Sequence, residues 1–246
     1  MKRVGTFILF LALWFHGVEQ CAFAATNDLF LRGVNAFDTG SFSDAAKTFR
    51  EAAERKPASG TLVNLGLTEW RRGRAGRAIL AWEQALWIDP FDSRAKGNLN
   101  YARQLTGVES PELTWFERAS AWLPVNTWAW LAGASLWLGI GLSVLPRVFR
   151  WRRSGWHQAV AAVSFGVFLL SLPALVGVVT RTRIGFVLQR DAPLRLTPTA
   201  EAESLAKLNA GEPLRTRGAR GDYVFVQTSR GQGWIAISQL GRICPR

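Results

Sequence analysis

The chain has 246 residues but only two cysteines and two histidines, which limits the chemistry it can perform. His16 lies near the N-terminus and His157 borders a long apolar run, so neither joins a metal cluster or a Ser-His-Asp triad elsewhere in the chain. Cys21 falls in a segment expected to be removed, so we expect no internal disulfide in the remaining chain, where Cys244 is the one cysteine of the sequence. No Gly-Lys-Ser/Thr phosphate loop occurs. We therefore expect no catalytic activity and no cofactor.

Acidic residues are also scarce, with 18 Asp and Glu against 30 Lys and Arg and a net charge of +12. Such an excess is typical of nucleic-acid-binding proteins. The outward topology argued below speaks against that partner, so we expect no nucleic acid. Anionic lipid or cell-wall polymer is the functional interpretation of the basic C-terminal part, and a merely solvated basic surface is the alternative.

Charge is missing altogether from two long apolar runs, Trp128–Leu145 and Gln158–Thr180. Each is long enough to cross a bilayer as a helix, and we place transmembrane helices at 127–146 and 158–180. A buried helical hairpin in a soluble domain is the alternative. Serines are the main polar side chains in the runs, whereas a transport pathway needs polar or ionisable groups at depth. The two helices are therefore expected to be anchors rather than part of a small transporter.

The N-terminal residues 1–24 read as a secretory signal, with a basic start, an apolar stretch and the small-x-small site Ala22-Phe23-Ala24; an uncleaved anchor is the alternative. The basic loop 147–157 between the spans is expected in the cytoplasm, because cytoplasmic loops are enriched in Lys and Arg. Arg181 and Arg183 beyond the second span weaken that assignment slightly. We predict a bacterial inner-membrane protein whose parts before and after the spans both face the periplasm.

An internal repeat with one constant spacing occupies the segment 25–107. Its landmarks are Gly33, Gly40, Ala45, Phe49, Ala52 and Pro57, which are answered in the same order by Gly66, Gly73, Ala78, Trp82, Ala85 and Pro90. Small residues at these places allow two antiparallel helices to approach closely, with the aromatic between them. This order resembles the tetratricopeptide repeat, whose stacked hairpins bind other proteins.

Two repeats fall short of the three or so that a stable stack needs. A further amphipathic run from Ala95 to Leu105, opened by Asp92 and stopped at Gly107, is expected to cap the stack. The repeats would then need support from the membrane, a second copy or a partner. The segment 108–126 is expected to be a juxtamembrane linker.

If the repeats bind a peptide, the first helix of each unit should line the groove, and Asn64 lies on such a helix with an amide that can bond a peptide backbone. Four arginines in and after the second hairpin turn are candidates for contact with an acidic partner, although a solvated turn is the default interpretation. They are Arg71, Arg72, Arg74 and Arg77.

From residue 184 the pattern changes to short β segments separated by turn residues, which predicts a small all-β barrel over 184–243. The candidate strands are Phe186–Leu188, Leu194–Leu196, Pro213–Thr216, Tyr223–Gln227 and Gly233–Ile237. The sequences Gly221-Asp222-Tyr223-Val224 and Gly231-x-Gly233-Trp234-Ile235 resemble two signatures of bacterial SH3-like (SH3b) domains. That resemblance implies that Trp234 and Tyr223 contribute to the barrel core or to a ligand groove, so both are candidate partner-binding residues. Core packing is the more common role for Trp234, and Tyr223 with its polar tip is the better candidate for contact with a partner.

Leader, tetratricopeptide hairpins, two-span anchor and SH3-like barrel, in that order, resemble the BatE-type proteins of the Bacteroides aerotolerance (Bat) group. The resemblance implies a non-catalytic membrane-anchored scaffold in an envelope or stress-related complex, with membrane-anchored von Willebrand factor A-type proteins as partners. The rival hypothesis is a peptidoglycan-binding protein that acts through its basic SH3-like domain.

Overall fold

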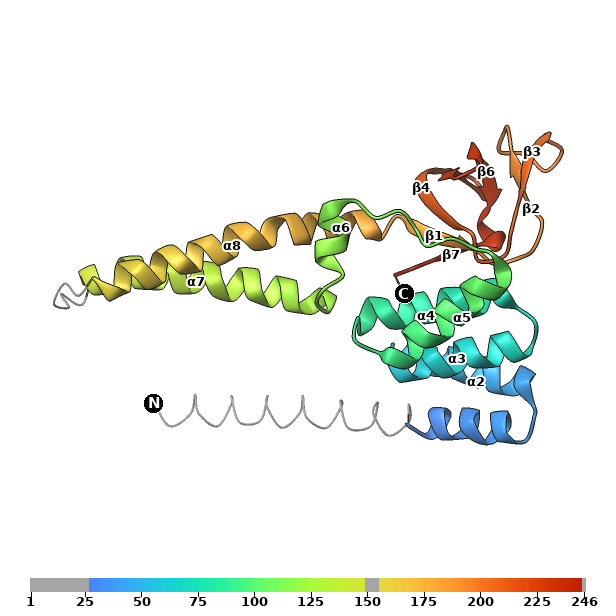
Figure 1. Ribbon diagram of the computed structural model, residues 1–246, viewed down its shortest axis with the longest axis horizontal. Helices are drawn as coiled ribbons and strands as arrows, with labels where there is room; N and C mark the ends of the chain where they lie inside the picture. Colours follow the sequence, from blue (N-terminus) through green and yellow to red (C-terminus); the bar gives the residue numbers. More distant parts are fainter. Residues whose placement is uncertain (1–26, 149–154, 245–246) are drawn as a thin grey trace, which may run out of the picture.

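The computed structural model describes residues 27–148 and 155–244. Two long helices project from a body in which helical hairpins lie beside a β-sheet (Figure 1). The expected leader, residues 1–24, and the central part of the predicted cytoplasmic loop lie outside the described residues.

Residues 27–106 form antiparallel helical hairpins. The first hairpin consists of a helix that includes residues 27–38, followed by α2 (Phe42–Arg55). The second consists of α3 (Ser59–Arg71) and α4 (Ala75–Ile88). The single helix α5 (Ser93–Thr106) follows as the predicted cap.

The two hairpins pack in the same way at equivalent positions of the repeat. A Cβ on Gly33 would come within 2.7 Å of the Phe49 ring, and a Cβ on Gly66 within 2.7 Å of the Trp82 ring. The glycines therefore let each helix lie directly against the aromatic of the next. The turn glycines correspond as well, because Gly40 and Gly73 have φ of 78° and 73°, a conformation that favours glycine.

Helix α5 has the ends that the sequence predicts. The Asp92 side chain accepts hydrogen bonds from the backbone N–H groups of Arg94 and Ala95, and Gly107 has φ of 67° at the C-terminal end. Asp92 also accepts a hydrogen bond of 2.8 Å from the Ser59 hydroxyl, which ties the start of α5 to the start of α3.

The predicted linker 108–126 contains a helix that the sequence analysis missed. This helix, α6 (Trp115–Ser120), begins with a capping box in which the Thr114 and Glu117 side chains bond each other's backbone N–H groups. It packs across the end of α8 so closely that Gly177 lies against the backbone of Phe116 and leaves no room for a side chain.

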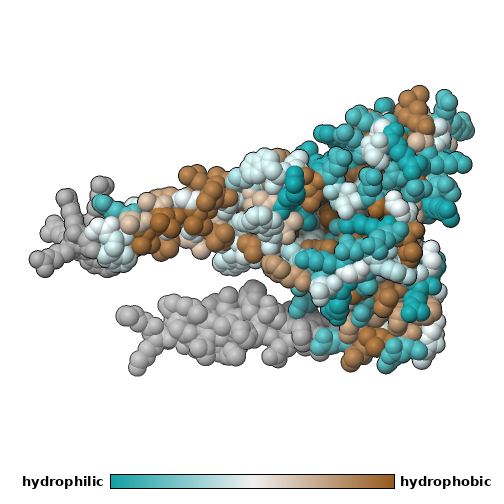
Figure 2. All heavy atoms as spheres, viewed as in Figure 1, coloured by the Kyte–Doolittle hydropathy of each residue, from teal (hydrophilic) through white to brown (hydrophobic). Residues whose placement is uncertain are grey.

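Helices α7 (Val125–Val148) and α8 (Trp156–Arg181) form a hairpin long and apolar enough to span a membrane. Their most apolar windows are only 17% and 22% buried, unlike core helices of a soluble domain. Figure 2 shows hydrophobic residues along this hairpin and hydrophilic ones over much of the repeats and sheet.

The C-terminal part is a seven-stranded antiparallel sheet in the order β3-β2-β6-β5-β4-β1-β7. Its strands are β1 (Ile184–Val187), β2 (Ala192–Arg195), β3 (Ser204–Leu208), β4 (Pro213–Arg220), β5 (Tyr223–Thr228), β6 (Gly231–Ala236) and β7 (Leu240–Arg242). The sheet is open, because the edge strands β3 and β7 do not pair with each other, so the predicted closure into a barrel is not found among the described residues. Inward side chains of both halves, such as Leu194 and Val226, form its core.

The helical repeats and the sheet share a second hydrophobic core. From the sheet side it contains Ile184 and Phe186 of β1 and Ile243 beyond β7, each at most 1% exposed. From the helical side it contains residues of α4 and α5: Ala78, Ile79, Trp82, Trp87, Leu99 and Ala102. The support that two repeats need thus comes from the chain's own sheet, an option that the sequence analysis did not consider.

Close backbone approach and a hydrogen bond reinforce this shared core. Gly76 of α4 lies so near β1 that a Cβ there would be 2.5 Å from the Val187 carbonyl oxygen. Gln84 of α4 donates a 2.9 Å hydrogen bond to the carbonyl of Arg242. The repeats and the sheet are therefore packed as one body rather than joined by a flexible linker.

Candidate functional site

Two of the four predicted arginines pair with one buried carboxylate at the end of α3, and a third lies near it. The side chain of Glu69 is 1% exposed and pairs with Arg72 at 3.1 Å and with Arg74 at 4.0 Å. Arg50 of α2 also donates a hydrogen bond to it. Arg71 is exposed and does not take part in this group.

Arg77, one turn into α4, adds a further positive charge next to these pairs. Burial lowers its pKa, Glu69 opposes that effect, and the neighbouring Arg50, Arg74 and Arg72 lower the pKa further. Arg77 makes no ion pair within 4 Å with a described residue. Among the described residues, Glu69 is the carboxylate that pairs with Arg50, Arg72 and Arg74 within 4 Å, while Asp44 and Glu54 line neighbouring hollows with some of these arginines. Arg77 has no such close pair, so its surroundings favour an incoming anion.

Two of these arginines, Arg74 and Arg77, line a cavity of about 720 Å³ between the repeats and the sheet. The turn before α4, the end of α5, the turn after β1 and the turn after β3 form its walls. Its polar lining side chains are those of Arg74, Arg77, Thr106, Gln189, Arg190 and Asn209, and its apolar ones include Leu105 and Leu188. Among the described residues, no acidic side chain lines it.

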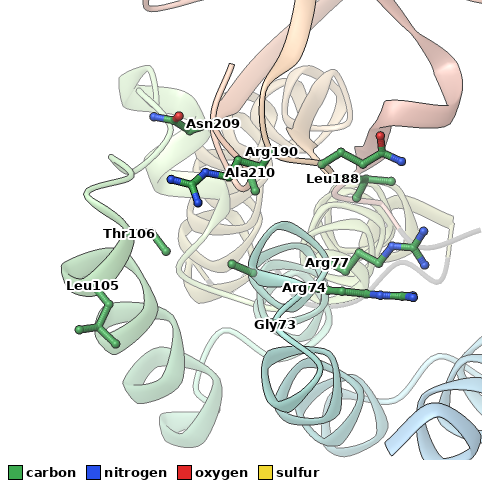
Figure 3. A pocket seen from close by; sticks show the side chains of 11 residues that line it. Gly73, Arg74, Arg77, Leu105, Thr106, Leu188, Arg190, Asn209 and Ala210 are labelled. Atoms are coloured by element: carbon green, nitrogen blue, oxygen red, sulfur yellow. The ribbon is translucent and has the colours of Figure 1, made fainter. Parts of the chain in front are cut away.

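Figure 3 shows how the basic side chains are arranged. Arg74 and Arg77 extend together to one side from the start of α4, whereas Arg190 extends to the other side from the turn after β1. The cavity therefore offers positive charge at two separate places, and amide and apolar groups also line it. An elongated anion with two charges fits this arrangement better than a small ion with one.

Asn64, the predicted groove residue, lies in α3 two helical turns before Arg71 and does not line this cavity. It is half-buried, and its side chain forms no hydrogen bond with the residues that the structure describes. The structure thus separates the two sets of residues that the sequence places together in the repeats.

Trp234 and Tyr223 lie on the outward face of the sheet and are half-buried. The inward positions of β5 and β6 belong to Val224, Val226 and Ile235, so the expected core role of Trp234 is not observed. Its ring packs instead against Phe225, with centroids 5.3 Å apart. Phe225 was missed as a surface aromatic, although strand alternation places it on the same face as Tyr223.

Buried charges join α6 to the sheet and α8 to the repeats, and the sequence analysis did not single them out. Arg215 of β4 donates two hydrogen bonds, of 2.8 and 2.6 Å, to the carboxylate of Glu117 in α6. Burial alone would raise the pKa of Glu117, but the bonds from Arg215 and from the Thr114 backbone outweigh it and lower the pKa to about 2. The Glu117–Arg215 pair therefore stays ionised at ordinary pH.

A second group lies where α8 meets the repeats. The Arg181 guanidinium stacks over the Trp87 ring, 4.9 Å from its centroid, and bonds the Ser120 hydroxyl at 3.4 Å. Nearby, burial raises the pKa of Glu83, although Arg103 and Arg181 counteract it. The end of α8 is thus held by the last turn of α4 and by α6.

In the part of the chain that the structure describes, no group of three or more His, Cys, Asp or Glu side chains is placed to hold a metal ion. Comparison with models of known protein families, with curated proteins and with solved structures gives no match. The residues themselves therefore carry the functional argument.

Proposed function

We propose that this protein is a non-catalytic scaffold, anchored in the bacterial inner membrane by α7 and α8, that presents the helical repeats and the sheet to other proteins in the periplasm. The observation that carries this proposal is the shared core of α4, α5 and β1, together with two polar contacts, the Glu117–Arg215 ion pair and the stacking of Arg181 on Trp87. Through these contacts the repeats and the sheet form one body that is attached directly to a hairpin long enough to span a membrane.

The repeated packing of Gly33 on Phe49 and of Gly66 on Trp82 supports the assignment of tetratricopeptide hairpins. The short antiparallel strands and the turns at Gly221 and Gly231, both with positive φ, support an SH3-like module, here with an open sheet. Both kinds of module are typical binding domains, which agrees with a role in assembly.

The shared core also supports the proposed topology. Because the repeats and the sheet pack together, they lie on the same side of any membrane that α7 and α8 cross. Arg181 is one of the two arginines that weaken the charge argument for this orientation. It is 7% exposed and its guanidinium lies over the Trp87 ring, so its charge is used in a contact inside the protein and not in an exposed loop. The positive-inside rule then favours the turn between the spans as the cytoplasmic end.

Cysteine labelling in intact cells tests the topology. Ser238 is exposed in the short 3-10 helix between β6 and β7, and Gln158 is exposed near the turn between the spans, so Ser238→Cys and Gln158→Cys form a matched pair. In a background without the native cysteines, a membrane-impermeant maleimide should label Ser238→Cys in cells whose outer envelope is permeabilised, and Gln158→Cys only after the inner membrane is opened. The opposite pattern would overturn the proposed orientation.

Chemical cross-linking in cells, followed by detergent extraction and mass spectrometry of a tagged copy, tests the scaffold itself. In line with the Bat-type resemblance, the expected result is recovery of membrane-anchored proteins with von Willebrand factor A-type domains. Recovery of no protein above the level of an unrelated tagged two-span protein would refute the proposal.

The second candidate function is peptidoglycan binding, and the outward aromatic face of the sheet favours it. Tyr223, Phe225 and Trp234 share this face, which Arg195 and Arg220 flank according to the strand register. Aromatic faces next to basic groups suit polymers with apolar sugar faces and carboxylates. Sedimentation of the detergent-solubilised chain with purified sacculi tests this; loss of binding at moderate salt would reduce it to charge-driven adhesion.

A further inference from the structure

The proposed scaffold needs a site for its partner, and the cavity between the repeats and the sheet is a candidate that neither module forms alone. Its walls come from the turn before α4, the end of α5 and two turns of the sheet, and the shared core holds these segments in place. We propose that this composite basic cavity binds an acidic segment of a partner protein, an inference that rests on the scaffold function proposed above.

Charge is the first argument. Arg74, Arg77 and Arg190 line the cavity, and none of the described lining residues is acidic. The carboxylate among the arginines behind it is Glu69, which already pairs with Arg72 and Arg50. Burial and the neighbouring arginines lower the pKa of Arg77, so a carboxylate placed beside it would relieve an unfavourable environment.

The lining distinguishes a protein segment from a small anion. Positive charge stands at two separate places, Arg190 on one side and Arg74 with Arg77 on the other (Figure 3). The amides of Gln189 and Asn209 can donate to and accept from a peptide backbone, while Leu105 and Leu188 give contact area for apolar side chains. A segment with carboxylates separated by apolar residues uses all of these groups, whereas one phosphate uses only a part.

Position argues against lipid head groups as the ligand. Trp87, at the membrane end of α4, contacts Arg181 at the end of α8, whereas Arg74 precedes the first turn of the same helix. Thirteen residues of helix separate them by about 20 Å, more than twice the Debye length of roughly 8 Å at physiological salt. In Figure 1 the turn between α3 and α4 lies on the side of the body away from α7 and α8. A soluble or neighbouring protein reaches this place more readily than the bilayer.

The test uses the full chain in nanodiscs of neutral lipid and a fluorescein-labelled peptide of alternating glutamate and leucine. Its control peptide has glutamine in place of glutamate. Fluorescence anisotropy should show binding of the acidic peptide that weakens with salt, and no comparable binding of the glutamine peptide. The triple change Arg74→Glu, Arg77→Glu and Arg190→Glu should weaken binding about tenfold or more.

The matched control reverses three exposed cations of the sheet that do not line the cavity, Lys207→Glu, Arg217→Glu and Arg220→Glu. It changes the net charge equally and should retain most of the binding. Because Arg74 also pairs with Glu69, the milder pair Arg77→Ala and Arg190→Ala serves as a second test that spares this ion pair. An acidic peptide that fails to bind, or that binds both triple variants equally, would overturn the cavity as the site.

The same triple variant in the cellular cross-linking experiment separates this inference from the proposed function. Recovery of the same partners by the wild type and by the triple variant would retain the scaffold and remove this site. Absence of partners for both chains would remove the scaffold instead.

Discussion

Phe186 provides the most direct test of whether the repeats and the sheet are one cooperative unit. It is fully buried in β1, inside the core that contains Trp82 and Leu99 from the helices. Replacement of such a phenylalanine by alanine removes its burial and leaves a cavity, which costs about 3–5 kcal/mol. Because Phe186 packs on α4 rather than within the sheet alone, Phe186→Ala should weaken both modules.

Hydrogen exchange of the nanodisc-embedded chain, followed by mass spectrometry, measures this for each segment. A loss of about 3–5 kcal/mol speeds exchange by a factor of roughly one hundred to a few thousand. We expect this acceleration in α4 and α5 as well as in β1. Leu196→Ala, at a sheet residue that is 57% exposed, is the control and should change protection little. If α4 and α5 keep their protection in Phe186→Ala while β1 loses it, the modules fold independently and the reasoning fails.

Three further outcomes are expected. Gly66→Ala should destabilise the repeats by about 1–3 kcal/mol in thermal unfolding, because its Cβ would meet the buried Trp82 ring, whereas Gly97→Ala, in open space on α5, should stabilise them by up to about 1 kcal/mol. The pKa of Glu117 is lowered to about 2, so its ionised form contributes up to about 3 kcal/mol to the free energy of unfolding above the ordinary pKa of 4.5, and this contribution is lost as pH falls from 4.5 toward 2. Glu117→Gln should therefore remove this pH dependence of stability between pH 4.5 and 2, and neither chain should show it between pH 5 and 7. Trp234→Ala should leave partner recovery in cells unchanged while weakening sedimentation with sacculi, and an equal loss of both would contradict separate sites for protein and wall.

The local part of the fold could be predicted from the sequence. The constant spacing of the repeat follows from contacts within each hairpin, such as Gly66 on Trp82, and these recur wherever the repeat does. The apolar runs likewise predict α7 and α8 to within two residues at each end. Interactions within a helix or between neighbouring helices leave a regular pattern in the sequence.

Contacts between distant segments could not be predicted in this way. Ile184 and Phe186 are spaced two residues apart, as apolar residues are in many strands, and this spacing does not indicate that α4 covers them. The sequence holds one indication. Leu99 stands one repeat length after Gly66, where a third hairpin would again need a glycine. The second hairpin therefore has no third hairpin to pack on, and another part of the protein has to cover its apolar face. The strands β3 and β7 were missed because they are only five and three residues long and depend on pairing with β2 and β1.

The residues of the candidate site also fall into a group that the sequence alone can suggest and a group that only the fold brings together. Arg74 and Arg77 could be found from the sequence because they are adjacent in it, whereas Arg190 and Asn209 join them only through the packing of the sheet on α4. The closed barrel was predicted from the run of short strands and turns, and the core role that is more common for Trp234 was taken from a family signature. The open sheet with its outward tryptophan departs from both.

The direct passage from α8 into β1 has a consequence for the proposed scaffold, because it leaves no linker between the hairpin and the binding body. Only two residues separate Arg181, stacked on Trp87, from Ile184 in the shared core. A binding body on a flexible tether searches a volume that its linker length sets. Here the reach is fixed, and the basic cavity stands about 20 Å along α4 from the membrane junction. In the proposed membrane topology, any tilt of the hairpin would move the whole body with it, and we expect a partner to present its acidic segment at a set height and orientation above the bilayer.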